Sequence, residues 1–164
     1  MNKITPPKMP TPYPPVREHR TLARLEGEWF CEGEIYLSPD QPLEVRAKLV
    51  NRGILHGLYI ESSSMHKNYE VGRVIYGYDP DDGRFLAFAI STASPRCDIE
   101  YGHYDSEADT LRFSCVEYVG VEKLAIRFER TIAFLSDHEF DMRITYPDME
   151  PHRQVGFAVR ARRI

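Results

Sequence analysis

The chain has 164 residues, a formal net charge of −4 at pH 7 and 42% hydrophobic residues, which is the composition of an ordinary globular protein. That length is typical of one domain and is enough to bury a sizeable core. The mild negative charge differs from the basic surface that binds nucleic acid, so we expect no nucleic-acid partner. No apolar run approaches the roughly 20 residues that span a bilayer, and we therefore expect no membrane insertion.

The cysteines and the first residues indicate a cellular compartment. Cys31, Cys97 and Cys115 form an odd set without CxxC spacing. The start of the chain lacks the apolar core of a signal peptide. Together these features predict a reduced, cytoplasmic environment with buried thiols rather than a disulfide scaffold.

Proline is concentrated at the N-terminus, where half of the 12 prolines lie within the first 15 residues. Such a tract sustains neither a helix nor a sheet ladder. We therefore expect a flexible proline-rich tail over residues 1–16 and a single domain over residues 17–164. A docking arm for a second subunit is the alternative interpretation of the tail.

The ordered part begins with a short helical turn that leads into a strand. Leu22 and Leu25 lie three residues apart on one helical face, Gly27 ends the turn, and Trp29 begins the strand. We expect the two leucines to close one end of the fold and any binding or chemistry to lie at the opposite end.

Beyond Trp29 the hydrophobic period is two along the rest of the chain, and hairpin turns such as Asp82-Gly83 separate the runs. The strand-like runs cover residues 29–37, 45–49, 58–64, 73–78, 85–91, 99–103, 111–115, 124–128, 140–146 and 155–159. No amphipathic helix lies between them to make parallel crossovers. About ten antiparallel strands remove their exposed edges by closing. The pattern predicts an all-β, up-and-down β-barrel with a short N-terminal helix at one end.

Several motifs carry a family resemblance. The opening His19-x-x-Leu22-x-x-Leu25-x-Gly27-x-Trp29 resembles the start of calycin-like barrels, which include lipocalins and fatty-acid-binding proteins. From residue 17 to about 163, the order of the later motifs resembles one bacterial family, the domain of unknown function numbered fifteen seventy-nine. Those later motifs are Gly53 to Gly57, Gly77-Tyr78-Asp79 with Gly83, and Gly102-His103-Tyr104-Asp105.

The resemblance has implications and limits. It implies a calycin-like barrel in which an arginine of the last strand, Arg160 or Arg162, packs across Trp29. It implies no particular activity, since the family has none agreed. The chain also departs from the family, which often has Trp-x-Asp where this sequence has Ala89-Ile-Ser91 and Gly-Gly-Arg where it has His56-Gly57-Leu58.

Four polar residues share the apolar phase of three neighbouring strands near one end. They are Tyr101 and His103, then Glu117, then Arg130. If all four face inward, they meet at the mouth of the barrel. There an arginine with a glutamate orients a ligand carbonyl or carboxylate, and a histidine serves as acid or base. The alternative is a structural Glu–Arg ion pair, with the other side chains at strand ends pointing to solvent.

A second polar cluster continues the apolar phase of Ile60 through Ser62 and Ser64. Small inward hydroxyls leave room for a ligand and offer it hydrogen bonds, although the same run also fits a polar strand end. The expected apolar walls come from the aromatic and methionine positions on inward phases. These are Phe85, Tyr101, Phe113, Phe128, Met142 and Phe157.

The leading hypothesis is a small-molecule-binding barrel for an apolar or aromatic ligand with a polar head. The alternative is an enzyme of acid–base isomerisation or cyclisation, in which His103 or Tyr101 transfers the proton and Arg130 stabilises an oxyanion. No His-x-His or His-x-x-x-His pair occurs, so we expect no metal and no cofactor.

Two further interpretations carry less weight. A haem-binding barrel would use one of His56, His66, His103 or His138. A filled barrel would act as an interaction domain, with a homodimer formed through Phe30 and Tyr36 or through Phe88.

Overall fold

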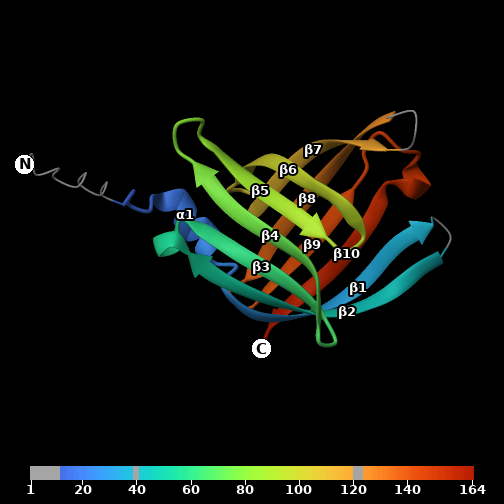
Figure 1. Cartoon of the computed structure of the whole chain (residues 1–164), viewed down its shortest axis with the longest axis horizontal. Helices are drawn as coiled ribbons and strands as arrows, with labels where there is room; N and C mark the ends of the chain where they lie inside the picture. The colour runs from blue at the N-terminus through green and yellow to red at the C-terminus, as the bar shows by residue number, and fades with distance from the viewer. Residues whose placement is uncertain (1–11, 39–40, 120–123) are drawn as a thin grey trace, which may run out of the picture.

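The computed structural model describes residues 12–38, 41–119 and 124–164, and within them ten strands form one closed antiparallel barrel (Figure 1). Each strand pairs with its neighbours in sequence, and β1 closes the barrel against β10. The predicted all-β, up-and-down barrel is therefore confirmed. The strands are β1 (Gly27–Ser38), β2 (Gln41–Ile54), β3 (Tyr59–His66), β4 (Tyr69–Asp79), β5 (Arg84–Ser91), β6 (Ser94–Asp105), β7 (Thr110–Val119), β8 (Leu124–Ser136), β9 (Glu139–Thr145) and β10 (Val155–Arg163).

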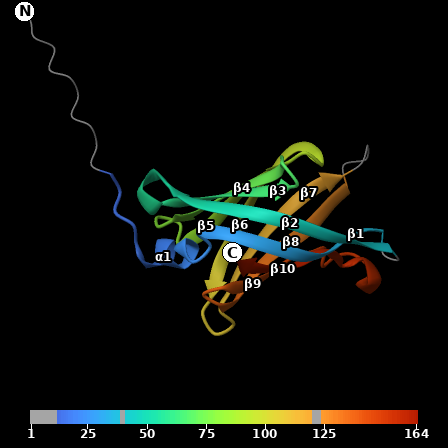
Figure 2. The same cartoon turned by 90° about the horizontal axis from the view of Figure 1, so that it is seen from below.

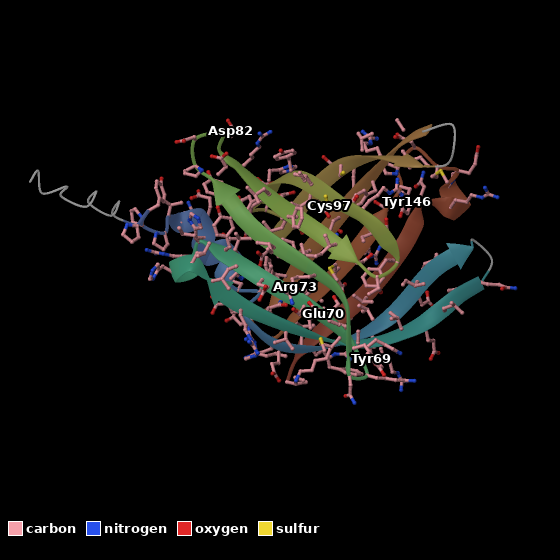
Figure 3. The ribbon with its side chains drawn as sticks, viewed as in Figure 1. Tyr69, Glu70, Arg73, Asp82, Cys97 and Tyr146 are labelled. Atoms are coloured by element: carbon pink, nitrogen blue, oxygen red, sulfur yellow. The ribbon has the colours of Figure 1, made fainter. Side chains whose placement is uncertain are left out.

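One end of the barrel is covered by the helix α1 (Arg17–Ala23), as Figures 1 and 2 show. Leu22 and Leu25 are each 1% exposed, because they insert into this end as predicted. We call it the helix end; it also carries the β4–β5, β6–β7 and β8–β9 turns. The far end carries the β3–β4 and β5–β6 turns, and Figure 3 shows Asp82 and Tyr69 at turns of the helix end and the far end respectively.

The helical elements are short. Besides α1 there are two 3-10 turns, η1 (Leu55–Gly57) and η2 (Pro151–Arg153). No helix in the described ranges has the length and apolarity that crossing a membrane requires. Of the predicted proline-rich tail, residues 1–11 lie outside the described residues, and residues 12–16 are irregular.

Gly27 makes the transition from helix to strand. Its φ of +122° lies in a region that L side chains rarely adopt. A Cβ at this position would lie 2.4 Å from Nη1 of Arg163. Glycine is therefore required by the backbone, and a side chain here would also displace the Arg163 guanidinium.

The arginine that packs on Trp29 is Arg163, and the expected Arg160 or Arg162 was wrong. Arg163 is the cross-strand partner of Trp29, and its Cζ lies 4.3 Å from the ring centroid. Its guanidinium also donates hydrogen bonds to the carbonyls of Glu26 (2.7 Å) and Asp137 (3.1 Å). Arg160 and Arg162 have the opposite strand phase and form ion pairs on the outer surface.

Side-chain burial divides the inner face into two halves. Towards the helix end most inward side chains are buried, although Tyr78 and Tyr104 are partly buried. Towards the far end most are only partly buried, although Phe128, Val159 and Ala89 are buried. The buried set includes Trp29, Ile60, Phe85, Leu111, Ile132, Phe140 and Ala161. The partly buried set includes Val45, Ala47, Ser64, Val74, Cys115, Ile126, Ile144 and Phe157. Most inward side chains of the far half are thus partly accessible to solvent, whereas most of those in the helix half are closely packed.

Candidate functional site

A buried ion pair lies where the two halves of the interior meet. Arg130 on β8 is 7% exposed, and Glu100 on β6 is 0% exposed. Nε of Arg130 donates to Oε2 of Glu100 at 2.8 Å, and Nη2 donates to Oε1 at 2.7 Å. Buried charges are rarely tolerated unless they are paired and hydrogen-bonded, and this pair satisfies both conditions.

Register explains how the two side chains meet across an intervening strand. Phe113 on β7 is the cross-strand partner of both Arg130 and Gly102. Glu100 lies two residues before Gly102 in the same phase, so Arg130 reaches past β7 to it. On the other side, Ala87 is the cross-strand partner of both Glu100 and Tyr76.

Tyr76 and Met142 complete the cluster around the guanidinium. Nη1 of Arg130 faces the Met142 sulfur at 4.0 Å, and a thioether is only a weak acceptor. The Tyr76 side chain is 3% exposed and lies within hydrogen-bonding reach of Arg130. We call Tyr76, Glu100, Arg130 and Met142 the inner polar cluster.

The electrostatics of the cluster keep Arg130 charged and Tyr76 neutral. Burial acts to lower the pKa of Arg130, but the facing Glu100 carboxylate outweighs burial and raises that pKa above its ordinary value. Asp98, half-buried two residues before Glu100, acts in the same direction. Burial raises the pKa of the Tyr76 phenol, so it remains protonated at neutral pH.

The inward orientation predicted for Tyr101 and His103 was wrong. Tyr101 is 45% exposed, with the Arg84 guanidinium 4.0 Å from its ring centroid, and His103 is exposed as well. The inward positions of β6 hold Asp98, Glu100 and Gly102 instead, although its apolar side chains suggested the opposite phase. Neither Tyr101 nor His103 lines the interior, so the acid–base step suggested for them has no geometry there.

A close backbone approach explains why an inward position of β6 is glycine. A Cβ on Gly102 would lie 2.1 Å from the Arg112 carbonyl oxygen and 2.8 Å from Cδ1 of Phe113. The close approach therefore requires glycine at this position, next to the charged Glu100 on the same face. An apolar-inward pattern cannot identify such a strand.

The other predicted site residues divide into three groups. Arg130 and Ser62 are buried on the inner face, and Ser64 is half-buried there. The Glu117 side chain lies outside the described residues, and the carboxylate that pairs with Arg130 is Glu100. Apart from Tyr101, the predicted wall residues lie on inward phases: Phe85, Phe113, Phe128 and Met142 are buried, and Phe157 is partly buried.

Sequence reasoning missed Glu100, Asp98 and Tyr76. Tyr76 shares the inward phase of Val74 and Tyr78, and this alternation along β4 could have predicted that Tyr76 faces the interior. Glu100 and Asp98 had only the indirect signal that a buried arginine requires a countercharge. The four histidines considered for haem, namely His56, His66, His103 and His138, are all exposed.

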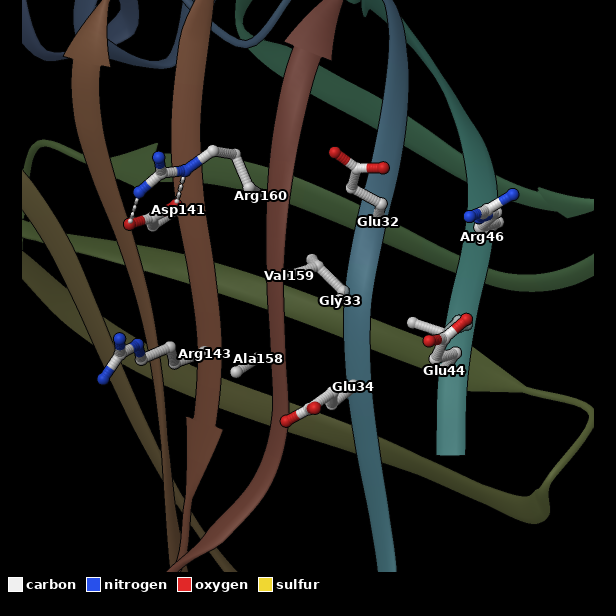
Figure 4. Close-up of a pocket in the computed structure, with 11 residues that line it drawn as sticks. Glu32, Gly33, Glu34, Glu44, Arg46, Asp141, Arg143, Ala158, Val159 and Arg160 are labelled. Atoms are coloured by element: carbon white, nitrogen blue, oxygen red, sulfur yellow. Dashed lines mark hydrogen bonds and ion pairs between the residues drawn. The ribbon is translucent and has the colours of Figure 1, made fainter. Parts of the chain in front are cut away.

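A second concave feature lies on the outside of the barrel, over β9, β10, β1 and β2 (Figure 4). This groove of about 450 Å³ is lined largely by charged side chains. Asp141 and Arg160 form an ion pair across it, with Nε to Oδ1 at 2.8 Å. Similar ion pairs lie elsewhere on the outer surface. One example is Arg73 with Glu70, which lie side by side in Figure 3. The groove therefore resembles the rest of the solvated exterior.

Fold and interior together define a calycin-like barrel with one end plugged by a helix and a charged pair inside. The chain belongs to the family described as Protein of unknown function (DUF1579), whose model matches residues 14–155. This match confirms the resemblance to that family, which rests on the opening motif together with the order of the later glycine motifs. The comparison with curated proteins gave no match.

Proposed function

We propose that the protein binds a small apolar or aromatic molecule that enters the barrel from the far end and places a polar head against the inner polar cluster. The observation that carries this proposal is the change in burial along the inner face. Phe128, Phe157 and Val74 are apolar inward residues of the far half of the interior. Arg130 lies deeper, where the far half meets the helix half. Binding sites of this type combine mostly apolar walls with a few placed polar groups.

The test uses an uncharged fluorescent probe, N-phenyl-1-naphthylamine, whose emission rises in apolar surroundings. We expect a saturable increase in fluorescence at neutral pH. The variant Ser64→Trp adds bulk on the inner face and should abolish the signal. Its neighbour Ser63 has the opposite phase, so Ser63→Trp is the matched control and should bind as the wild type does.

Two outcomes would contradict the proposal. One is the absence of a saturable signal with the folded wild-type protein. The other is an equal signal from wild type and Ser64→Trp, which would place the probe outside the barrel. Circular dichroism and thermal melting of each variant establish that the barrel is intact.

Two expectations from the sequence stay predictions beside this proposal. A cytoplasmic location remains one. A homodimer remains the other, and the outer face of β5 and β6 supports it, since Phe88 and its cross-strand partner Ile99 are 37% and 52% exposed. Sedimentation velocity measures the oligomeric state directly.

A further inference from the structure

The charges inside the barrel constrain the head group of any ligand. Among the described residues, the charged side chains that act on Arg130 are Glu100 and Asp98, and Tyr76 is the neutral polar group beside it. The single positive charge is matched by Glu100, which leaves Asp98 as an additional negative charge. An arriving carboxylate would bring another negative charge into an apolar surrounding that already has an excess of negative charge, and this is costly.

Arg130 has one guanidinium nitrogen that Glu100 does not use, and the Tyr76 phenol is the other polar group within reach of the guanidinium. Its Nε and Nη2 are used by Glu100, with donor–acceptor distances of 2.7–3.1 Å. The remaining nitrogen, Nη1, faces the weakly accepting sulfur of Met142 at 4.0 Å. A neutral oxygen that replaces this contact gains a charge-assisted hydrogen bond without adding charge.

The carboxylate of Asp98 offers the complementary group. It is half-buried on the inward phase of β6, on the far-end side of Glu100. A carboxylate only accepts hydrogen bonds, so it favours a ligand N–H or O–H beside the oxygen that Arg130 binds. An amide carries both groups on one carbon and has no net charge.

We propose that the ligand head is an uncharged amide-like group, with its carbonyl oxygen on Nη1 of Arg130 and its N–H directed to Asp98. This inference rests on the proposed function, because it names the class of ligand for that same site. Glu100 then acts as the residue that selects against acids, by neutralising the arginine that would otherwise attract them.

The experiment compares three probes with the same seven-carbon tail: octanamide, octanoate and octylamine. Each is titrated against bound N-phenyl-1-naphthylamine at pH 7.5. We expect octanamide to displace the probe at a concentration at least about tenfold lower than octanoate, and lower than octylamine. Glu100→Gln retains the size and an accepting oxygen but removes the charge, so it should strengthen octanoate binding and reverse or abolish the preference.

Glu61→Gln is the matched control for Glu100→Gln. Glu61 pairs with Arg73 on the outer surface at 3.0 Å, and its loss changes the net charge by the same amount. Its preference should equal that of the wild type. Asp98→Asn provides a second inner variant if Glu100→Gln does not fold, and it should shift the preference toward octanoate in the same direction.

The outcomes separate this inference from the function on which it rests. Failure of N-phenyl-1-naphthylamine itself to bind overturns the proposed function. Saturable probe binding overturns the amide inference alone in either of two cases. The first is displacement led by octanoate or octylamine, and the second is no displacement by any of the three.

Discussion

Arg130 and Glu100 place two opposite charges in an interior that is otherwise largely apolar. A buried ion pair often contributes little net stability, because the cost of removing both charges from water offsets their attraction. Loss of only one partner is much more harmful, since it leaves the other charge buried alone. The pair is therefore better explained by a role in recognition than by a role in stability.

The cost of burying one unpaired charge determines how substitutions of the pair affect unfolding. Arg130→Met leaves the Glu100 carboxylate buried without its partner, and we expect a loss of about 3–5 kcal/mol in the free energy of unfolding. The double variant Arg130→Met with Glu100→Leu removes both charges and should recover most of that loss. Urea denaturation at pH 7 measures both values.

The surface provides a control for the same residue type. Arg162 forms ion pairs with Glu32 and Glu139 and is half exposed. We expect Arg162→Met to lower the free energy of unfolding far less than Arg130→Met does, because exposed ion pairs contribute little to stability. A double inner variant no more stable than Arg130→Met alone would refute the explanation offered for the pair.

The element α1 is held over its end of the barrel by polar contacts as well as by its leucines. Arg24, just after the helix, binds Asp109 of the β6–β7 turn through two hydrogen bonds of 2.5 and 3.0 Å. His19 is 3% exposed, and its Nδ1 accepts a hydrogen bond from the Val16 N–H at 3.0 Å. The ring packs edge-on against Tyr78 of β4.

His19 makes the stability of this element depend on pH. Burial lowers the pKa of His19 below its ordinary value, against the opposing effect of the Glu18 carboxylate. The folded state therefore holds the neutral ring, while the unfolded chain binds a proton below about pH 6.5. Stability is fully present above that pH and decreases as the pH falls below it.

Urea midpoints at pH 7.5 and pH 5.5 test this prediction, in a window above the range where most carboxylates titrate. The urea midpoint of the wild type should be lower at pH 5.5 than at pH 7.5. The decrease should be smaller in His19→Gln. His103 is exposed, so His103→Gln should behave as the wild type. An equal fall in His19→Gln and wild type would show that another group is responsible.

At the level of elements, the sequence allowed most strands to be oriented correctly but not β6. Period-two patterns correctly placed Ser62, Phe113 and Arg130 on the inner face, because apolar neighbours on each strand set the phase. On β6 the inward residues Asp98, Glu100 and Gly102 are charged or glycine, and Ile99 and Tyr101 face outward. Glu100 meets Arg130 because of the register of β6 and β8 on either side of β7. The alternation pattern of a single strand does not contain this register.

Across the whole molecule, the three cysteines report on the two halves of the interior and on the exterior. Cys97 is exposed on β6, Cys115 is half-buried on the inward phase of β7, and Cys31 is buried near the helix end. Burial raises the pKa of the Cys31 thiol to about 12. Thiol reactivity requires both access and a thiolate. The three cysteines therefore differ in their expected reactivity, and Cys115 is the one whose access a ligand in the far half would change.

We therefore expect alkylation by iodoacetamide at pH 8, followed residue by residue by mass spectrometry, to be fastest at Cys97, slower at Cys115 and slowest at Cys31. A saturating concentration of N-phenyl-1-naphthylamine should slow alkylation of Cys115 and leave Cys97 unchanged, because only the former lies on the wall that the ligand covers. In Ser64→Trp the probe should have no effect on either residue. Unchanged alkylation of Cys115 under saturable binding would mean that the ligand lies outside the far half of the barrel, and uniform slowing of all three thiols would indicate general stabilisation instead.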